Sequence, residues 1–294
     1  MFKVSVVVPH YGDPRPTLRL LGQLRSSSSI LEVIVVDDCS PTRFPDDAPA
    51  RVIHRPVNGG FGAAVNTGAA TATGELLLIL NSDLRIDPGF VDGLVAAADP
   101  WMPCAAAPDI VGTDGAADPT GRHFPAIGHQ AVEWLTPLAH WRDRRLLHEA
   151  VGHDTRAVPG QVTTVDWLVG AALLLPLADF RAVGGFDEQF HMNSEEVDLQ
   201  RRLRTRGLPS LYVGTVNAIH EGGASSDPAL RRRWLVESRD AYAAKWGGRG
   251  RLRMSLTAAT GANLVWNAGR SAAGRDVHPL ATARHELDLI WRRR

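Results

Sequence analysis

Cysteine, net charge and long hydrophobic runs are all scarce in this chain, and each absence argues against a class of protein. The two cysteines in 294 residues, Cys39 and Cys104, make no disulfide framework and have no metal-binding spacing, so we expect reduced thiols in a cytoplasmic protein. The formal net charge is +0, which removes the bulk electrostatic basis for nucleic-acid binding. No apolar run reaches the roughly 18–20 residues that cross a bilayer. The N-terminus enters an apolar segment without a basic region and cleavage site, so we expect no signal peptide.

The remaining composition is that of an ordinary globular protein. Hydrophobic residues make up 44% of the chain and charged residues 22%. The length suits one large α/β domain or two small ones.

The prediction of the fold and of the site starts from the stretch between Leu76 and Asp83. Five consecutive apolar residues predict a short buried strand, and the tripeptide Asn81-Ser82-Asp83 ends it. In open α/β sheets, ligands bind at the carboxyl ends of the strands. Asp83 is therefore either a reactive carboxylate at that edge or a residue that opens the next turn.

Hydrophobic patterns on either side of this stretch predict the fold class. They give strands over 2–8, 30–36, 51–54 and 76–80 and helices over 17–24 and 63–73. This alternation predicts an α/β fold with a doubly wound, mostly parallel sheet flanked by helices. Later segments predict strand and loops over 99–128, a helical excursion over 132–150 that could act as a lid, strand over 162–175 and 210–213, and helices over 195–206, 228–245, 252–271 and 281–294.

Acidic and glycine-rich segments follow the early strands. Asp37 and Asp38 end one strand and Asp83 ends another, so these carboxylates should gather along one edge of the sheet. Asn58-Gly59-Gly60 lies at a strand-to-helix junction, where backbone N–H groups either approach an anionic ligand or simply shape a turn. Pro9-His-Tyr-Gly12 follows the first strand, so the dinucleotide-binding fingerprint is absent there.

Taken in order, these segments resemble glycosyltransferase family 2, whose members have the GT-A fold. The motifs are Val6-Val-Val-Pro-His-Tyr11, Val35-Val-Asp-Asp-Cys-Ser40, Asn58-Gly-Gly60 with Asn66-Thr-Gly68, Asn81-Ser-Asp83, Gly170-Ala171, Gly184-Gly-Phe-Asp-Glu188 and Glu195-Glu-Val-Asp-Leu199. The similarity is greatest to an actinobacterial rhamnosyltransferase-like branch. It implies a GT-A domain over 1–226, with a nucleotide-sugar-binding half over about 1–100 and an acceptor half over about 101–226. A helical extension over 227–294 would follow.

The resemblance implies transfer of a sugar from a pyrimidine nucleotide diphosphate sugar, dTDP- or UDP-linked, to an acceptor hydroxyl with inversion. It also implies a divalent cation, Mn²⁺ or Mg²⁺, held by Asp83 and His220; a structural His220 is the alternative. Asn81 stands where the family has an aspartate and brings no charge. The residues implied to bind the nucleotide sugar are Pro9, Tyr11, Asp37, Asp38, Asn58, Gly60, Asn66, Asn81, Ser82 and Asp83.

The resemblance also places the catalytic base on the helix predicted from Glu195. Family members usually have Glu-Asp there, so Glu196 is the implied base and Glu195 the reserve, with Ser194 as the helix cap. Carboxylates in a first helical turn can also act only as partners of the helix dipole. The residues implied to face the acceptor are Trp167, Gly170, Ala171 and Asp198.

The implied acceptor is a glycan or a lipid-linked sugar, in cell-wall or surface glycan assembly. Leucine, tryptophan and arginine mix in the last two predicted helices, which favours either the inner face of the plasma membrane or packing on the domain or a second subunit. Two other functions stay open at this point. One is a nucleotidyltransferase, a class that favours a glycine- and arginine-rich loop with lysine after the first strand; Pro9-His-Tyr-Gly12 at that place counts against it. The other is a non-catalytic nucleotide-sugar- or carbohydrate-binding protein, which Asn81 and Glu196 keep in consideration.

Overall fold

The structure is a computed structural model that describes residues 2–141, 144–222 and 228–292. Its contacts divide the chain into two compact units. Residues 1–122 and 156–226 form the first, which we call the α/β unit, and residues 123–155 and 227–294 form the second, the helical unit. Segment 123–155 therefore belongs with the C-terminal helices by its contacts, and the predicted boundary at residue 226 stays a prediction.

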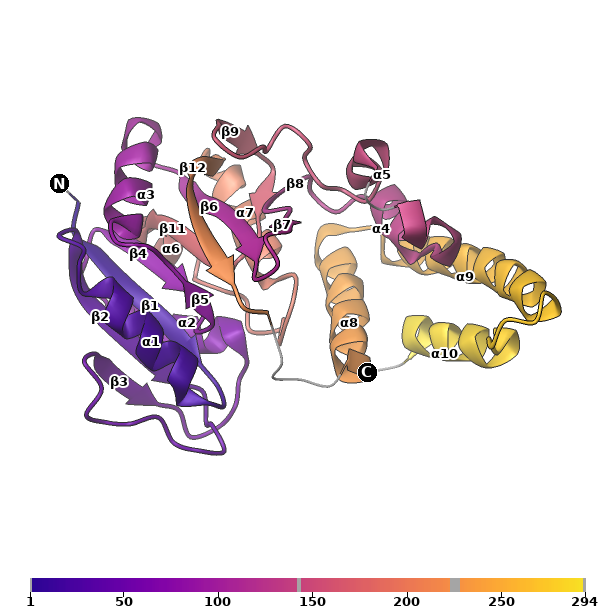
Figure 1. Cartoon of the computed structure of the whole chain (residues 1–294), viewed down its shortest axis with the longest axis horizontal. Coiled ribbons are helices and arrows are strands. Elements are labelled where there is room, and N and C mark those ends of the chain that lie inside the picture. The colour runs from indigo at the N-terminus through magenta and orange to yellow at the C-terminus, as the bar shows by residue number, and fades with distance from the viewer. Residues whose placement is uncertain (1, 142–143, 223–227, 293–294) are drawn as a thin grey trace. The chain divides into compact units, whose positions relative to one another are not determined.

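The α/β unit alternates strands and helices along most of its length (Figure 1). Its strands are β1 (Val4–His10), β2 (Ile30–Asp37), β3 (Arg51–His54), β4 (Leu76–Leu80), β5 (Leu84–Arg85), β6 (Ala105–Gly112), β7 (Ala117–Asp118), β8 (Gly121–Arg122), β9 (Val162–Val165), β10 (Trp167–Leu168), β11 (Ala172–Pro176) and β12 (Ser210–His220). Its helices are α1 (Pro14–Leu24), α2 (Phe61–Thr71), α3 (Phe90–Ala98), the short 3-10 helix η1 (Asp99–Trp101), α6 (Leu177–Ala182) and α7 (Glu195–Thr205).

One large sheet carries the α/β unit, in the order β3-β2-β1-β4-β11-β6-β12-β5. Strands β3, β2, β1 and β4 are parallel, as are β6 and β12, while β11 runs antiparallel between β4 and β6. The predicted α/β fold with a doubly wound, mostly parallel sheet is confirmed. The parallel strands place the carboxyl ends of β1, β2 and β4 at one edge.

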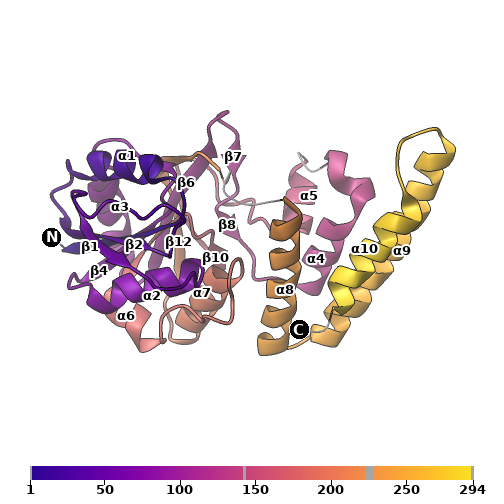
Figure 2. The same ribbon diagram turned by 90° about the horizontal axis from the view of Figure 1, so that it is seen from below.

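Alternate residues of each strand point to opposite faces of the sheet, so they contribute to two hydrophobic cores, one on each face. Val6 and Leu78 pack with helices α1 and α3, whereas Val7 and Leu77 pack with α2, α6 and α7. Figure 2 shows the two helix layers on opposite faces. Gly68 lets α2 lie directly on β1, because a Cβ at this position would come within 2.7 Å of the Val7 side chain.

Several predicted boundaries and elements were wrong. Strand β12 runs on to His220 through a register shift between Val213 and Asn217, which places His220 beside β5. The single strand predicted over 162–175 is three short strands, β9 to β11. Helix α3 was not predicted. Ser194 precedes α7 but does not cap it, because its backbone is left-handed (φ 69°) and its side chain makes no cap hydrogen bond.

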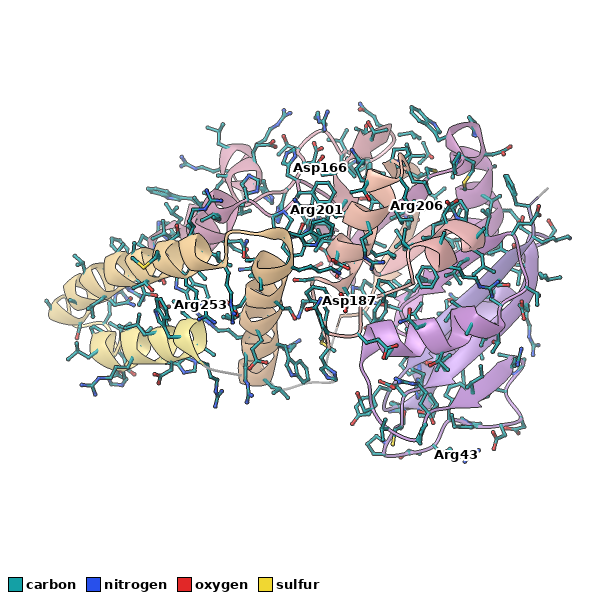
Figure 3. The ribbon with its side chains drawn as sticks, turned by 180° about the vertical axis from the view of Figure 1, so that it is seen from behind. Arg43, Asp166, Asp187, Arg201, Arg206 and Arg253 are labelled. Atoms are coloured by element: carbon teal, nitrogen blue, oxygen red, sulfur yellow. The ribbon has the colours of Figure 1, made fainter. Side chains whose placement is uncertain are left out.

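The helical unit contains α4 (Ile127–Trp134), the 3-10 helix η2 (Thr136–Trp141), α5 (Arg145–Ala150), α8 (Pro228–Trp246), α9 (Arg249–Ala272) and α10 (Pro279–Trp291). Helices α9 and α10 pack side by side. Arg253, labelled in Figure 3, lies on α9, where its guanidinium pairs with Asp240 of α8 at 2.7 Å and stacks over Trp291 of α10. None of the helices in the described ranges is both long and apolar enough to cross a membrane.

Candidate active site

Two metal-ligating side chains predicted from the sequence lie together at the sheet edge. Asp83 follows β4, and His220 ends β12, where it pairs with Leu84 of β5. The His220 Nε2 lies 3.2 Å from the Asp83 Oδ1, and the Asn81 amide nitrogen lies 3.4 Å from the same imidazole nitrogen. The hydrogen bond to Asp83 raises the pKa of His220, against the lowering effect of burial.

The backbone of this cluster is anchored from two sides. The Asn81 N–H donates to the carbonyl of Ala171, the residue just before β11, at 2.8 Å, and the Glu221 N–H donates to the Asp83 carbonyl at 3.1 Å. The Glu221 carboxylate in turn pairs with Arg85 and, at 2.6 Å, with Arg19. Asp83 and its neighbours are therefore held in place before any ligand arrives.

A carboxylate oxygen and an imidazole nitrogen that face each other suit Mn²⁺ or Mg²⁺ as a partial ligand set. Turning the Asn81 amide would place its oxygen toward the same point. Among the described residues there is no group of three or more His, Cys, Asp or Glu side chains that could hold a metal ion. The protein's own residues fit a divalent cation only if a ligand such as a diphosphate supplies the remaining oxygens.

Asp37 is the last residue of β2, and its carboxylate organises the turn that follows. It is 2% exposed and accepts hydrogen bonds at 3.0 Å from Ser40 N–H, Phe44 N–H and the His54 imidazole. Burial alone would raise the pKa of Asp37, but these hydrogen bonds outweigh it and lower the pKa to about 2. The carboxylate is therefore ionised and fixed.

Asp38 joins the β2 turn to the glycine-rich loop. Its carboxylate accepts from the Gly59 N–H at 3.1 Å and the Gly60 N–H at 2.8 Å, and it pairs with Arg55. The exposed Asn58 also accepts from Gly60. Gly60 has φ 86°, and a Cβ there would lie 2.2 Å from the His191 carbonyl oxygen, so both its conformation and its surroundings require glycine.

The other predicted donor-side residues have mixed surroundings. Asn66, on α2, directs its polar atoms at the 186–188 segment: it donates to the Phe186 carbonyl at 2.9 Å and accepts from the Phe186 N–H at 2.8 Å. Tyr11 is 46% exposed beyond β1, whereas Pro9 and Ser82 are half-buried. Asn66 thus fastens the loop that precedes α7, and contact with nucleotide stays a prediction for all these residues.

The two predicted base candidates open α7. Glu195 is 5% exposed, and its pKa is raised well above the ordinary value, first by burial and then by the Glu196 charge; burial also raises the pKa of Glu196. One carboxylate oxygen of each is buried without a hydrogen-bond partner within the described part of the chain. Asn193 and Ser194, just before them, both have left-handed backbones. Raised pKa and backbone strain together are typical of functional sites.

Among the predicted acceptor residues, Gly170 lies against this helix start. A Cβ on Gly170 would lie 3.3 Å from the Glu196 Cβ, so the missing side chain leaves room beside that carboxylate. Trp167, on β10, lies under the Arg122 guanidinium. Ala171 is buried and contributes its carbonyl to Asn81. Asp198 is fully buried and pairs with Arg202 at 2.8 Å, which makes it a support for α7; its predicted contact with acceptor stays a prediction.

Sequence reasoning missed one residue that joins these parts. Gln200 is fully buried and makes a two-way bridge to Leu168, accepting from its N–H at 2.9 Å and donating to its carbonyl at 2.8 Å. It also donates to the Glu196 carbonyl at 3.1 Å. No motif marks this glutamine, and its only signal is a polar residue one helical turn after Glu196.

Known proteins are similar to this chain in sequence and in fold. Residues 5–149 match the family model "Glycosyl transferase family 2". The N-acetylglucosaminyl-diphospho-decaprenol L-rhamnosyltransferase of Mycobacterium tuberculosis (strain CDC 1551 / Oshkosh) is 31% identical over 255 residues, covering 78% of this chain and 80% of the relative.

Two solved structures share the fold. The mannosyltransferase PcManGT from Pyrobaculum calidifontis, in complex with GDP-Man and Mn²⁺, has a TM-score of 0.58 at 16% identity and covers 98% of this chain and 85% of its own. S. aureus TarS 1–349, in complex with UDP-GlcNAc, has a TM-score of 0.52 at 16% identity, with 87% of this chain and 70% of that chain covered. With the sequence match and the fold in agreement, this chain belongs to glycosyltransferase family 2, and it is a hexosyltransferase of GT-A fold.

Proposed function

We propose that this enzyme transfers a sugar, with rhamnose as the first candidate, from a pyrimidine nucleotide diphosphate sugar to a hydroxyl of a lipid-linked or glycan acceptor, with inversion and with a divalent cation. The observation that carries this proposal is the pair of carboxylates at the start of α7, with raised pKa values and unpartnered oxygens, in the same unit as the Asp83–His220 pair. One pair supplies a base and the other a cation site, which are the two groups that the reaction needs.

Each residue then has a stated task. A bound Mn²⁺ or Mg²⁺ would neutralise the departing diphosphate, held by Asp83 and His220 with Asn81 beside them. The loops fixed by Asp37, Asp38 and Gly60 would bind the nucleotide, and Asp37 would reach the imide of the base only by exchanging one of the hydrogen bonds that it accepts from Ser40, Phe44 and His54. Glu196 would take the proton of the acceptor hydroxyl as that oxygen attacks the anomeric carbon and the nucleoside diphosphate leaves. A single displacement of this kind inverts the anomeric centre.

The donor and acceptor halves follow from the same assignment. We place donor recognition in residues up to about 100 and acceptor recognition in about 101–226, in line with the predicted division of the domain. The Mycobacterium relative is named for transfer to N-acetylglucosaminyl-diphospho-decaprenol, which supports a sugar on a prenyl diphosphate as acceptor and a role in cell-wall assembly. Family membership sets aside the nucleotidyltransferase and binding-protein alternatives.

The test is release of nucleoside diphosphate. The enzyme is incubated with dTDP-rhamnose, UDP-sugars or GDP-mannose, with Mn²⁺, Mg²⁺ or EDTA, and with N-acetylglucosaminyl-diphospho-prenol. We expect acceptor-dependent release of dTDP or UDP that EDTA abolishes, and loss of both turnover and metal-dependent nucleotide binding in Asp83→Ala. Preference for GDP-mannose would overturn the assignment of a pyrimidine nucleotide donor, and full turnover in EDTA would overturn the requirement for a divalent cation.

A further inference from the structure

Helix α9 of the helical unit distributes its side chains in an unusual way. Its buried face turns polar along the second half, with Thr260, Asn263 and Asn267 all at most 5% exposed. Its exposed face carries large apolar side chains instead: Met254 is 63% exposed, Val265 75% and Trp266 43%. A helix of a globular protein normally shows the reverse arrangement, because apolar groups are more stable away from water.

The buried polar residues have partners inside the unit, so the arrangement is specific. The Asn263 amide donates to the Trp134 carbonyl at 2.9 Å and accepts from the Thr136 N–H at 2.8 Å. The Thr260 hydroxyl accepts from the Trp134 indole N–H at 2.9 Å. These bonds fix which side of α9 faces inward, and the apolar side therefore faces outward.

The exposed apolar residues form one continuous strip, which we call the α9 outer face. No charged residue occurs from Met254 through Gly269. A spacing of three or four residues lines the strip along one side of the helix, over about 27 Å. Its members are Met254, Ala258, Ala262, Val265, Gly269 and Ala272.

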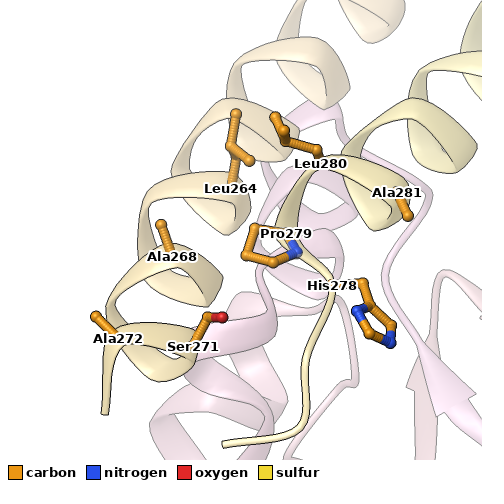
Figure 4. Close-up of a pocket in the computed structure, with 8 residues that line it drawn as sticks. All are labelled: Leu264, Ala268, Ser271, Ala272, His278, Pro279, Leu280 and Ala281. Carbon is orange, nitrogen blue, oxygen red and sulfur yellow. The ribbon is translucent and has the colours of Figure 1, made fainter. Parts of the chain in front are cut away.

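At its C-terminal end the strip meets a pocket of about 700 Å³ between α9 and α10, drawn in Figure 4. Ala268 and Ala272 line it from α9, and Pro279 and Leu280 from the start of α10. Leu280 is itself 65% exposed. The uncovered apolar surface thus extends from one helix to the next.

The charge of the helical unit indicates which kind of partner this surface binds. The helical unit has 17 Lys and Arg against 10 Asp and Glu, a formal charge of +7. Arg251 lies one turn before Met254 and Arg275 lies just beyond Ala272, so both ends of the strip are basic. Arg251, Arg275 and Arg284 are exposed, and none of them forms an ion pair within the part of the chain that the structure describes.

We propose that the α9 outer face docks on the surface of an anionic lipid bilayer, with its apolar strip at the acyl boundary and its arginines at the lipid headgroups. A helix lying in this plane gains from apolar burial and from attraction to anionic lipid together. A symmetric contact with the same face of a second copy fits less well, since each copy would then present a unit of charge +7 to the other. The inference does not depend on the sugar donor, because binding to lipid is measured without substrate.

The test is co-sedimentation of the full chain with vesicles of phosphatidylcholine, alone or mixed with phosphatidylglycerol. We expect strong partition onto the mixed vesicles, weak partition onto phosphatidylcholine, and loss of binding as salt rises. Val265→Asp places a charge in the strip and should weaken binding roughly tenfold or more. Arg251→Gln should weaken it about fivefold on anionic vesicles only.

Leu31→Asp is the matched control, because Leu31 is a 50% exposed leucine on β2 of the α/β unit. It should bind vesicles like the unaltered chain, and circular dichroism should show all three variants folded. Two outcomes would overturn the proposal. One is equal partition onto vesicles with and without phosphatidylglycerol, and the other is equally strong vesicle binding by Val265→Asp and Leu31→Asp. A dimer in solution that Val265→Asp dissociates would likewise replace the bilayer with a second copy.

Discussion

The two units of this enzyme differ most in charge and in how they treat buried polar groups. The α/β unit has 15 Lys and Arg against 22 Asp and Glu, a formal charge of −7, and the helical unit carries +7. The net charge of zero thus conceals two oppositely charged parts. An overall charge excludes a partner only when the charge is evenly spread, and here it is not.

Buried polar groups serve different ends in the two units. In the helical unit, Asn263 and Glu286 are buried and hydrogen-bonded to each other at 3.3 Å. In the α/β unit, Glu195 and Glu196 each leave a buried oxygen without a partner in the described residues. A satisfied buried group specifies packing, whereas an unsatisfied one keeps chemical capacity at a cost in stability.

The largest expected effect tests the unsatisfied pair. Glu196→Gln keeps the shape of the side chain but cannot take a proton, so kcat should fall roughly 10²–10⁴-fold. The dissociation constant for nucleoside diphosphate should stay near that of the unaltered enzyme, because Asp37, Asp38 and Asp83 are unchanged. Steady-state kinetics with calorimetric titration of the nucleotide separates these effects.

Glu195→Gln is the control for that substitution. It should cost less in kcat than Glu196→Gln and leave the pKa of the acid limb of the rate profile nearly unchanged, because the raised pKa of Glu195 already keeps that residue uncharged while Glu196 titrates. A dead Glu195→Gln beside a near-normal Glu196→Gln would move the base by one residue. Normal turnover in both would exclude this pair as the source of the base.

The next effect concerns the glycine-rich loop. Gly60→Ala combines an unfavourable positive φ with a Cβ that would lie 2.2 Å from the His191 carbonyl oxygen. It should cost roughly 3 kcal/mol of unfolding free energy, as strain and overpacking add. The midpoint temperature of thermal denaturation should fall, and nucleotide should bind more weakly than to the unaltered enzyme.

Gly160→Ala separates the two causes. Gly160 also has a positive φ, +81°, but a Cβ there meets nothing within 4 Å. Only the backbone cost, on the order of 1 kcal/mol, should remain, with nucleotide affinity unchanged. Equal losses in both variants would show that the approach of His191 to Gly60 is unimportant.

The sequence predicted what depends on local pattern. Leu76 to Leu80 is a buried strand, the elements before it alternate as predicted, and Asp83 and His220 meet although 137 positions separate them in the chain. They meet because β12 extends to His220 and pairs there with Leu84 of β5, the residue after Asp83. The resemblance to the family suggested the pair, whereas the strand predicted over 210–213 stopped short of His220.

Long-range packing accounts for what was missed. Ser194 has a left-handed backbone in a loop whose His191 carbonyl lies against Gly60, and the bridge from Gln200 to Leu168 exists only once α7 lies beside β10. The sequence of α9 has the pattern of an ordinary amphipathic helix, and that pattern does not show that the apolar face is the outward one. Which face is buried was decided by Trp134, more than 120 positions earlier in the chain.

A smaller effect should appear at low pH in the α/β unit. The pKa of Asp37 is about 2 in the folded protein against an ordinary value of 3.8, so the folded state favours its charged form. This stabilisation, roughly 2 kcal/mol, is present above pH 4 and is lost as pH falls toward 2. Asp37→Asn should flatten the loss of unfolding free energy between pH 4 and 2 in chemical denaturation. An unchanged pH dependence would mean that other carboxylates dominate the acid limb.

The smallest effect tests the satisfied core of the helical unit. Asn263→Ala removes the partner of the Thr136 N–H and of the Trp134 carbonyl, and it leaves Glu286 with one bond fewer. We expect a loss of about 1–2 kcal/mol of unfolding free energy, because buried groups are left unpaired. Asn217→Ala, at an exposed position on β12, removes the same amide and should change stability by less than about 0.5 kcal/mol. Nucleotide affinity should be equal in both, since neither residue belongs to the donor loops. A loss of nucleotide affinity in Asn263→Ala alone would show that the helical unit supports the donor site, and the division of tasks between the two units would then be wrong.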